Sequence, residues 1–386
     1  MKIEFIIFFG IALLIYGSVH FYIFIRGWQA CAAAGGVFQV FYAVVFWALA
    51  LSFIAGRVLE NYVQNGYADA VVWMGSLWLS VMVYLFFFVL MLDLGRFLFT
   101  VFGNTPSQWT DSYESFKFFI GAFGFLLALS VTAFGFWNAR TPVVKELEIV
   151  LEKEGGEKKE WTIVVASDIH LGTIVHKNRA EALVASVNAL KPDLVLFAGD
   201  TIDEDIRPVI RRDIGESLKK ISSRYGIYAI TGNHEYIGGA DAAVKYLEDH
   251  GITMLRDSYA LIGDGLYVVG REDLSVERFA GIKRKSIDEL FQGVDISKPI
   301  IILDHQPFSL DAVARDGRAD IQFSGHTHHG QLWPFNFITE IIYELSWGHK
   351  RMGNTEFYVS SGWGTWGPPI RVGNTPELVR LKLKLQ

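Results

Sequence analysis

Cysteine is almost absent from this sequence: there is one, Cys31, in 386 residues. A single cysteine excludes an intramolecular disulfide and a zinc site built from several thiolates. The sequence also lacks the patterns Gly-x-x-x-x-Gly-Lys-Ser/Thr and Gly-x-Ser-x-Gly. A P-loop nucleotidase and a hydrolase that uses a serine nucleophile elbow are therefore unsupported.

Charged side chains are scarce in the first third of the chain. Residues 1–140 hold six of the 35 basic and six of the 41 acidic residues, which leaves 29 basic and 35 acidic residues in the remainder. The net charge of −6 thus belongs to the remainder. An acidic region without a basic stripe lacks the electrostatic footprint of nucleic-acid binding. We therefore expect a protein of two parts, with no nucleic acid as partner.

Long apolar runs occupy the weakly charged region. Each is close to the roughly 20 residues that a helix needs to cross a bilayer. The first run is long for a signal peptide and lacks a clear small-residue cleavage site. We expect four transmembrane helices within residues 1–140, with the lipid bilayer as their partner, rather than buried helices of a large soluble core. The runs are Phe5–Ile25, Val37–Ala55, Val71–Leu92 and Phe118–Trp137.

The basic residues beside these runs bear on the orientation. An even number of spans places both ends of the bundle on one side of the membrane. Four basic residues flank that side, Lys2, Arg57, Arg140 and Lys145, against three on the other, Arg26, Arg96 and Lys117. Because positive charge favours the cytoplasmic side, we expect a multi-pass protein of the cell (inner) membrane whose second part lies in the cytoplasm.

Polar residues follow five strand-like segments in the second part of the chain. The segments are 161–166, 193–198, 227–230, 299–303 and 319–323, and each is followed by Asp, Asn or His. Sites in α/β sheets gather at the carboxyl ends of strands, so these side chains are expected to meet. Each fragment alone also fits a turn or a helix cap. The most specific is Gly325-His-Thr-His328, because imidazole is the commonest metal ligand.

Taken in order, the fragments resemble the calcineurin-like metallophosphoesterase superfamily. Its pattern is Asp-x-His, Gly-Asp, Gly-Asn-His-Glu/Asp, His and Gly-His-x-His, and all of it is present between Asp168 and His328. The resemblance extends from about residue 144 to the C-terminus. It is closer to a branch often tethered to membranes, which includes YkuE-like and YaeI-like bacterial proteins and the transmembrane metallophosphoesterases. His329 stands where many relatives have Gly, and we expect it to add no ligand.

The resemblance implies an α/β fold for the second part, a two-sheet αββα metallophosphoesterase sandwich of residues 141–386. From the apolar runs we expect a four-helix transmembrane bundle, residues 1–140, before it, although this arrangement is not diagnostic of the superfamily. The resemblance also implies two divalent metal ions, with Asp200 bridging them. The remaining ligands would be Asp168, His170 and His328 for one ion and Asn233, His305 and His326 for the other. Mixed oxygen and imidazole ligands suit Mn²⁺ best here, with Fe, Zn or Co as alternatives.

Four further residues receive roles from what this chemistry needs and from their places in the sequence. His234 would protonate the leaving oxygen, as a general acid beside the attack of a metal-bridging hydroxide. Glu235 and Asp304 would orient neighbouring imidazoles. Arg371, in a loop rich in Gly and Pro, would clamp a phosphate.

A membrane-tethered site favours substrates in or near the membrane. We therefore expect a metal-dependent phosphodiesterase or pyrophosphatase that cleaves a lipid-linked or cell-envelope phosphate, such as a UDP-diacylglucosamine-like lipid. We infer no obligate protein partner. The alternative is a metal- or nucleotide-sensing module that regulates the four-span bundle, although the scarcity of intramembrane polar residues speaks against it.

Overall fold

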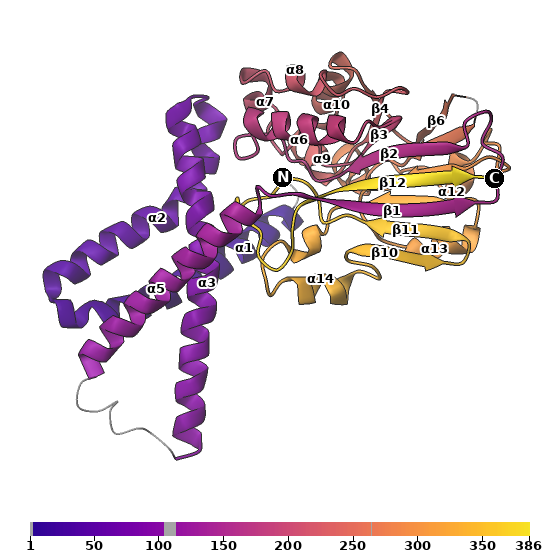
Figure 1. Cartoon of the computed structure of the whole chain (residues 1–386). Coiled ribbons are helices and arrows are strands. Elements are labelled where there is room, and N and C mark those ends of the chain that lie inside the picture. Colours follow the sequence, from indigo (N-terminus) through magenta and orange to yellow (C-terminus); the bar gives the residue numbers. More distant parts are fainter. Residues whose placement is uncertain (1–2, 104–112, 264) are drawn as a thin grey trace. The chain divides into compact units, whose positions relative to one another are not determined.

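The computed structural model describes residues 3–103, 113–263 and 265–386 (Figure 1). These residues form two compact units, Met1–Gly135 and Phe136–Gln386. The division falls within a helix, a few residues before the boundary expected at residue 140.

The first unit contains four long apolar helices. They are α1 (Ile3–Ala30), α2 (Gly36–Tyr62), α3 (Gly66–Val101) and α5 (Tyr113–Asn138), with the short 3-10 turn η1 (Cys31–Ala34) after α1. Each of the four is long and apolar enough to cross a membrane, so the prediction of four such helices is confirmed.

Small residues bring α2 and α3 close together. A Cβ atom on Gly75 would collide with the backbone of Phe53, and one on Gly56 would lie 3.0 Å from the backbone of Val72. Small residues at such crossings allow the backbones of membrane helices to approach. A buried hydrogen bond also ties α3 to α1, because the Trp78 indole donates to His20 Nε2 at 3.0 Å. His20 is therefore a link between helices.

The second unit is built on two six-stranded mixed sheets. The first has the order β1 (Val143–Leu151), β12 (Glu377–Leu385), β2 (Glu160–Ala166), β3 (Leu194–Ala198), β4 (Ile227–Ile230) and β5 (Ile252–Met254). The second has the order β10 (Gly348–Met352), β11 (Thr355–Val359), β9 (Ile321–Ser324), β8 (Ile300–Leu303), β7 (Leu266–Gly270) and β6 (Ser258–Ile262). Strands β2 to β5 run parallel, as do β7, β8, β9 and β11.

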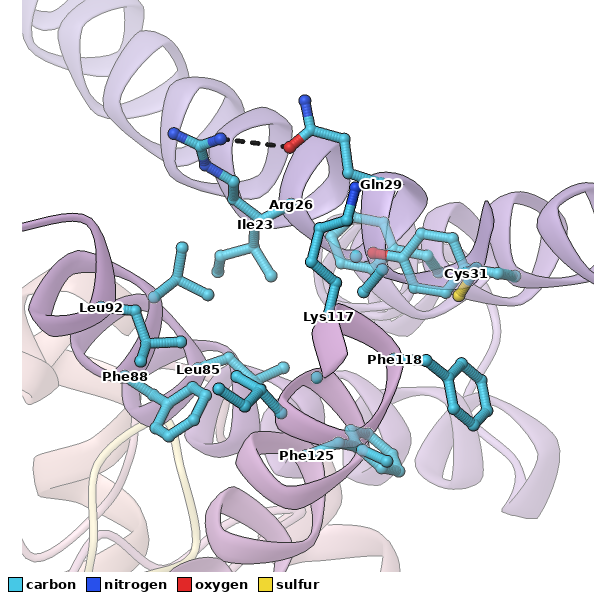
Figure 2. Close-up of a pocket in the computed structure, with 18 of the residues that line it drawn as sticks. Ile23, Arg26, Gln29, Cys31, Leu85, Phe88, Leu92, Lys117, Phe118 and Phe125 are labelled. Atoms are coloured by element: carbon cyan, nitrogen blue, oxygen red, sulfur yellow. Dashed lines mark hydrogen bonds between the residues drawn. The ribbon is translucent and has the colours of Figure 1, made fainter. Parts of the chain in front are cut away.

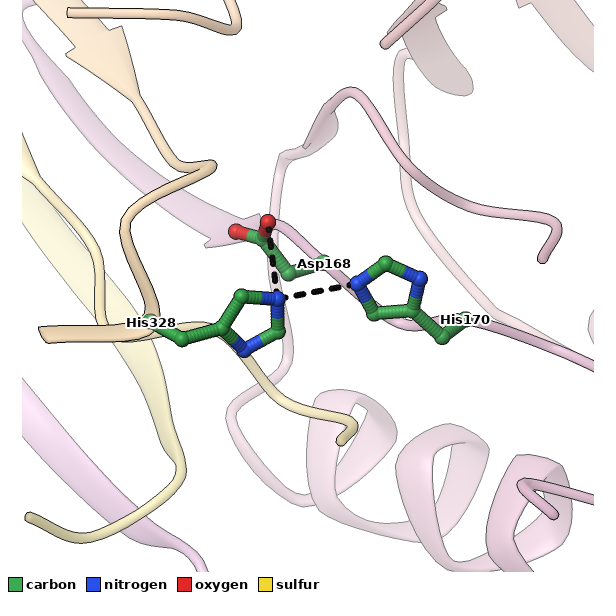
Figure 3. Close-up of side chains that lie close together, drawn as sticks. All are labelled: Asp168, His170 and His328. Atoms are coloured by element: carbon green, nitrogen blue, oxygen red, sulfur yellow. Dashed lines mark hydrogen bonds and ion pairs between the residues drawn. The ribbon is translucent and has the colours of Figure 1, made fainter. Parts of the chain in front are cut away.

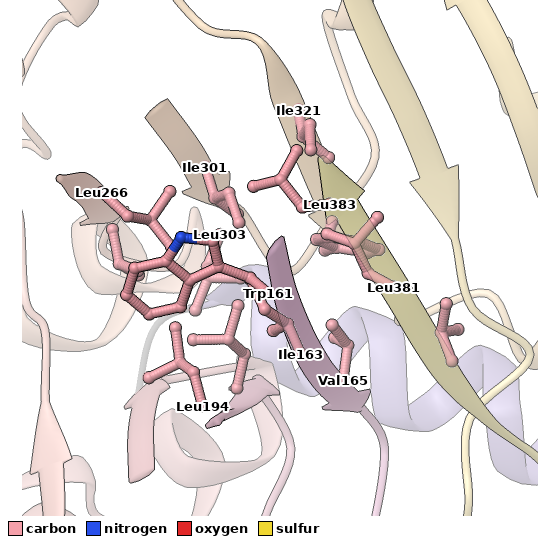
Figure 4. Close-up of a cluster of buried hydrophobic side chains, with 14 of the residues drawn as sticks. Trp161, Ile163, Val165, Leu194, Leu266, Ile301, Leu303, Ile321, Leu381 and Leu383 are labelled. Atoms are coloured by element: carbon pink, nitrogen blue, oxygen red, sulfur yellow. The ribbon is translucent and has the colours of Figure 1, made fainter. Parts of the chain in front are cut away.

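Apolar side chains from both sheets meet in one core (Figure 4). Trp161 and Ile163 of β2 pack in the same cluster as Ile301 of β8 and Leu381 of β12. The central strands read as continuous apolar runs because both of their faces are buried. Burial of this kind contributes about 25 cal/mol for each Å² of apolar surface removed from water.

Helices cover the outer faces of the sheets. A second apolar cluster joins Ile300 and Ile302 of β8 to Leu310 and Val313 of α13. Helices α6 and α10 lie beside β2 to β4 (Figure 1). The predicted two-sheet αββα arrangement is therefore confirmed. The helices of this unit are α6 (Lys177–Ala189), α7 (Arg207–Arg211), α8 (Gly215–Leu218), α9 (Asn233–Gly238), α10 (Ala240–Asp249), α11 (Ser275–Ala280), α12 (Ile287–Leu290), α13 (Leu310–Asp316), η2 (His328–Gly330) and α14 (Asn336–Ile342).

Candidate metal centre

The backbone turns sharply where the predicted ligands follow their strands. Asp168, His170, Asp200, His326 and His328 all have positive φ, between 47° and 70°. Residues other than glycine adopt this left-handed conformation rarely, and it concentrates at functional sites. Each such turn changes the direction of the chain shortly after the strand ends. The side chains at these turns therefore point into the candidate metal centre.

Two glycines leave room for the carboxylates. A Cβ atom on Gly325 would collide with Asp168 Oδ2, and one on Gly232 would collide with Asp200 Oδ1. Gly325 precedes His326, and Gly232 precedes Asn233. The strand-end loops can therefore approach one another only because these positions carry no side chain.

The first ligand group consists of Asp168, His170 and His328 (Figure 3). All three are buried. The Nε2 atoms of His170 and His328 face each other at 2.9 Å, and His328 Nε2 lies 3.4 Å from Asp168 Oδ1. Two imidazole nitrogens bound to one cation at about 2.1 Å would have a similar separation.

The second ligand group contains Asp200, His305 and His326. His305 Nε2 lies 3.0 Å from Asp200 Oδ2 and 3.3 Å from Asn233 Oδ1. The same amide oxygen lies 2.7 Å from His326 Nδ1. The amide oxygen of Asn233 thus completes a set of four donor atoms.

Asp200 lies between the two groups. Its Oδ2 atom is 3.0 Å from His305 Nε2 in one group and 3.9 Å from His170 Nε2 in the other. Burial raises the pKa of Asp200, but His305, His234 and His170 outweigh burial and hold that pKa well below its usual range. An ionised carboxylate in this position can offer oxygen to ions in both groups.

The donor set fits divalent cations. It combines imidazole nitrogens, carboxylates and one amide oxygen, which suits transition metals better than Ca²⁺. The facing nitrogens of His170 and His328 leave no room for a proton on both, so their lone pairs favour a shared cation.

His234 lies beside the ligand groups and bonds to a carboxylate. Its Nδ1 is 2.9 Å from Asp203 Oδ1, and its ring centre is 4.5 Å from that of His170. Burial lowers the pKa of His234, but Asp200 and Asp203 more than compensate and raise it to about 9. The side chain can therefore carry a proton next to the candidate metal ligands.

Asp203 was missed by the sequence reasoning. Its Oδ1 atom faces His234 and also lies 3.7 Å from His170 Nδ1. By its contacts, this residue has the orienting position that we expected of Glu235 and Asp304. The available indication was an acid three residues after Asp200, in Gly199-Asp-Thr-Ile-Asp203.

Glu235 and Asp304 contact groups other than imidazoles. Glu235 accepts hydrogen bonds from the backbone amides of Asp200, Ile202 and Gly232, at 2.7–3.2 Å. It lies at the third position of α9 and turns back to cap that helix. Asp304 is paired with Arg271 and Arg284 at 2.8 and 3.0 Å, because a buried carboxylate needs cationic partners. Both residues support the loops that carry the ligands.

Arg371 also differs from the expectation. It is fully buried, and burial lowers its pKa to about 10. Its guanidinium donates to the Gly362 and Gly364 carbonyls and to Asn374 Oδ1, and Nη2 lies 3.1 Å from His328 Nδ1. With its donors engaged by protein atoms, Arg371 positions His328 from behind and is not available as a phosphate clamp.

We predict that Arg371→Lys weakens metal binding by about 10–100-fold, the usual cost of losing a group that holds a metal ligand in place. Lysine keeps the positive charge but lacks the planar fork that reaches several acceptors. Mn²⁺ affinity measured by calorimetry tests this directly. Arg380→Lys is the matched control, since Arg380 pairs with Glu146 on the first sheet. Unchanged affinity in a folded Arg371→Lys protein would show that the contact is dispensable.

Comparison with known proteins gives consistent matches. Residues 162–330 match the calcineurin-like phosphoesterase family. An uncharacterized metallophosphoesterase of Helicobacter pylori (strain J99) is 33% identical over 67% of this chain and 69% of its own length. One from Campylobacter jejuni is 29% identical over 98% of this chain and 99% of its own. A transmembrane protein with metallophosphoesterase domain from Danio rerio is 32% identical over 67% of this chain and 62% of its own.

Proposed function

This chain belongs to the calcineurin-like metallophosphoesterases, hydrolases of phosphoric esters, and on that premise we propose a membrane-anchored dimetal phosphodiesterase or pyrophosphatase that acts on a lipid-linked or cell-envelope phosphate. The observation that carries the hydrolytic part is the convergence of two ligand groups on Asp200. Four candidate membrane-spanning helices support the anchoring.

Seven residues would hold the metal ions. One ion would be held by Asp168, His170 and His328, the other by Asn233, His305 and His326, and both by Asp200. When bound, two divalent ions neutralise phosphate oxygens and lower the pKa of a bound water toward neutral. Mn²⁺ is our first choice, before Fe, Zn and Co, because the donors mix oxygen with imidazole nitrogen.

His234 would deliver a proton to the leaving oxygen. Its Nδ1 bond to Asp203 fixes the ring and leaves Nε2 to act as the proton donor. The Trp366 ring, 6.0 Å from the His234 ring, lines the same region and would help to exclude water. Proton transfer by a positioned side chain typically accelerates such reactions by about 10²–10⁴-fold.

An exposed apolar surface next to the ligands supports a lipid substrate. Helix α14 begins a few residues after His328 and contacts η2. Its side chains Phe337, Ile338 and Ile341 are exposed, Ile341 by 85%. Apolar side chains on a short surface helix are typical of segments that enter the headgroup region of a bilayer. We propose that α14 receives the apolar part of the substrate, such as a UDP-diacylglucosamine-like lipid, at the cytoplasmic face of the cell membrane.

Metal removal tests the hydrolytic part of the proposal. Chelator-treated full-length protein should lose hydrolysis of bis-(p-nitrophenyl) phosphate and regain it with Mn²⁺ but not with Ca²⁺, because Ca²⁺ prefers a shell of six to eight oxygens. The chelated protein should remain folded by circular dichroism. Full activity after chelation would refute a metal-dependent mechanism.

A substitution on α14 tests the lipid part separately. We expect Ile341→Asp to lower kcat/KM for a phosphorylated lipid in mixed micelles by about tenfold or more. The reason is that the apolar part of the lipid loses its contact with the isoleucine side chain. Hydrolysis of soluble bis-(p-nitrophenyl) phosphate should not change. Ile210→Asp, at an exposed site on α7, is the matched control. Equal effects of the two variants on the lipid would argue for a soluble substrate.

A further inference from the structure

A pair of aromatic side chains borders the second ligand group. The ring centre of Tyr343 lies 6.1 Å from that of His326, and the ring centre of Phe308 lies 4.8 Å from that of Tyr343. Phe308 is 37% exposed and Tyr343 is partly buried, so a bound molecule can reach the pair. Phe308 follows His305 by three residues in the same strand-end loop. The pair is therefore an accessible aromatic surface beside one half of the candidate metal centre.

Exposed apolar side chains of α14 adjoin this pair in the chain. Tyr343 is the residue after the helix, and its backbone amide donates to the Thr339 carbonyl at 2.9 Å. Ile341 and Ile342, the last two residues of α14, are 85% and 57% exposed. An apolar group that lies against the aromatic pair thus has further apolar surface next to it, and both surfaces favour the removal of hydrocarbon from water.

A single indole borders the first ligand group. The ring centre of Trp366 lies 6.0 Å from that of His234, which lies 4.5 Å from that of His170. The Trp366 side chain is 50% exposed, although its backbone amide and carbonyl both bond to the buried Gln331 side chain, at 2.9 and 2.8 Å. A large ring that remains in solvent on a fixed backbone does little for packing. Its position suits contact with a flat or polar group of a bound molecule.

His234 relates these two surfaces to the two halves of a substrate. In the proposed reaction, water adds its oxygen to phosphorus and the bond from phosphorus to the leaving oxygen breaks. His234 protonates that oxygen and regains a proton from the solvent, to which the water has lost one. The leaving oxygen lies opposite the attacking one, in line with it. The leaving group is therefore next to His234 and Trp366, and the group that keeps the phosphate is directed away from them.

We propose that the substrate lies across the centre in one direction. Its apolar half keeps the phosphate and packs against Phe308, Tyr343 and α14. Its polar half leaves past His234 and Trp366. This orientation rests on the proposed hydrolysis and adds to it that the apolar product carries the phosphate. The reverse orientation would place an apolar chain against one indole and leave the aromatic pair without a partner.

Two diesters with the same leaving group test the apolar half. In octyl p-nitrophenyl phosphate and methyl p-nitrophenyl phosphate, the nitrophenyl group leaves and the alkyl group keeps the phosphate. Both are assayed with Mn²⁺ and the full-length protein in one detergent. We expect kcat/KM to be about tenfold or more higher for the octyl ester, because several methylene groups gain an apolar contact. Tyr343→Ala and Phe308→Ala should each reduce this octyl-to-methyl ratio by about fivefold.

Two further substitutions separate the position of a ring from its loss. Tyr259→Ala removes another partly exposed tyrosine that pairs with a second ring, Tyr267, but lies on the edge strand β6. It should leave the ratio unchanged. Trp366→Ala should lower kcat/KM for both esters by the same factor, because both carry the nitrophenyl group. Trp366→Phe should restore most of that loss.

Three results would overturn the orientation. One is an unchanged ratio in Tyr343→Ala, in a protein with unaltered thermal stability. Another is loss of the ratio in Trp366→Ala but not in Tyr343→Ala, which would reverse the substrate. The third is an equal loss in Tyr259→Ala, which would assign the effect to general destabilisation. Absence of hydrolysis of either ester by the unaltered protein would instead refute the proposed hydrolysis, and the orientation with it.

Discussion

Asp200→Asn should reduce hydrolysis of bis-(p-nitrophenyl) phosphate by about 10³-fold or more. Asp200 lies within reach of both ligand groups, with its Oδ2 atom 3.0 Å from His305 Nε2 and 3.9 Å from His170 Nε2. Asparagine keeps the shape but removes the negative charge that both cations of the proposed centre would share. Charge stabilisation by metal ions contributes several kcal/mol to such reactions, and each 1.36 kcal/mol is tenfold in rate.

The measurement combines kcat with metal content. Elemental analysis of the purified Asp200→Asn protein should show loss of metal together with the loss of activity. Asp205→Asn is the control in the same loop, because Asp205 pairs with Arg207 and lies outside both ligand groups. Activity of Asp200→Asn within tenfold of the unaltered protein would remove the bridging role.

His234→Gln should lower kcat by about 10²–10⁴-fold while leaving the metal content unchanged. His234 lies outside both ligand groups of the proposed centre and bonds to Asp203 instead. The loss should be greater for an alkyl phosphodiester than for a nitrophenyl one, because a poor leaving oxygen depends more on protonation. Asp203→Asn should produce the same dependence on the leaving group with a smaller effect.

A matched histidine provides the control for that variant. His250→Gln alters a ring that bonds to the Tyr246 carbonyl on α10, away from the ligand groups. It should leave both substrates unaffected. If His234→Gln slowed both esters equally, or if it lost metal, His234 would be a structural or ligating residue and not the proton donor.

The ligand positions could be predicted because each follows an apolar strand within a short pattern. Asp168 and His170 follow β2, Asp200 follows β3, and His326 and His328 follow β9. Parallel strands bring their carboxyl ends to one edge, so local sequence was sufficient to expect a meeting of side chains. Their residue roles remain predictions that the metal and activity measurements test.

The groups behind the ligands could not be assigned in the same way. Arg371 and His328 are far apart in the sequence, and their contact depends on how the loop after β11 folds back. No short sequence pattern predicts that an arginine side chain will be fully buried. From the sequence, we expected Glu235 to face an imidazole. In the structure, the short helix α9 turns its carboxylate toward the backbone amides of Ile202 and Gly232.

The long apolar helices were the simplest feature to predict, since length and apolarity alone define a candidate span. The apolar pocket between them, of about 590 Å³, was not predictable (Figure 2). It depends on where bulky side chains are missing between helices, as at Gly95, and hydropathy does not report that. Hydropathy likewise gave no reason to expect that Tyr22 and Arg26 would share Asp93.

The position of β12 has a consequence for biosynthesis. Strand β12, Glu377–Leu385, lies between β1 and β2. The edge of β1 at Val143 therefore stays unpaired until Glu377 has been synthesised. Domains tend to fold as they emerge during synthesis, but here β1 and β2 lack their neighbour until the residues of β12 have been translated. The apolar helices will already have been translated by then. With the proposed anchoring, the two sheets assemble on a chain that is held at the bilayer, where exposed strand edges are less free to pair with those of other copies.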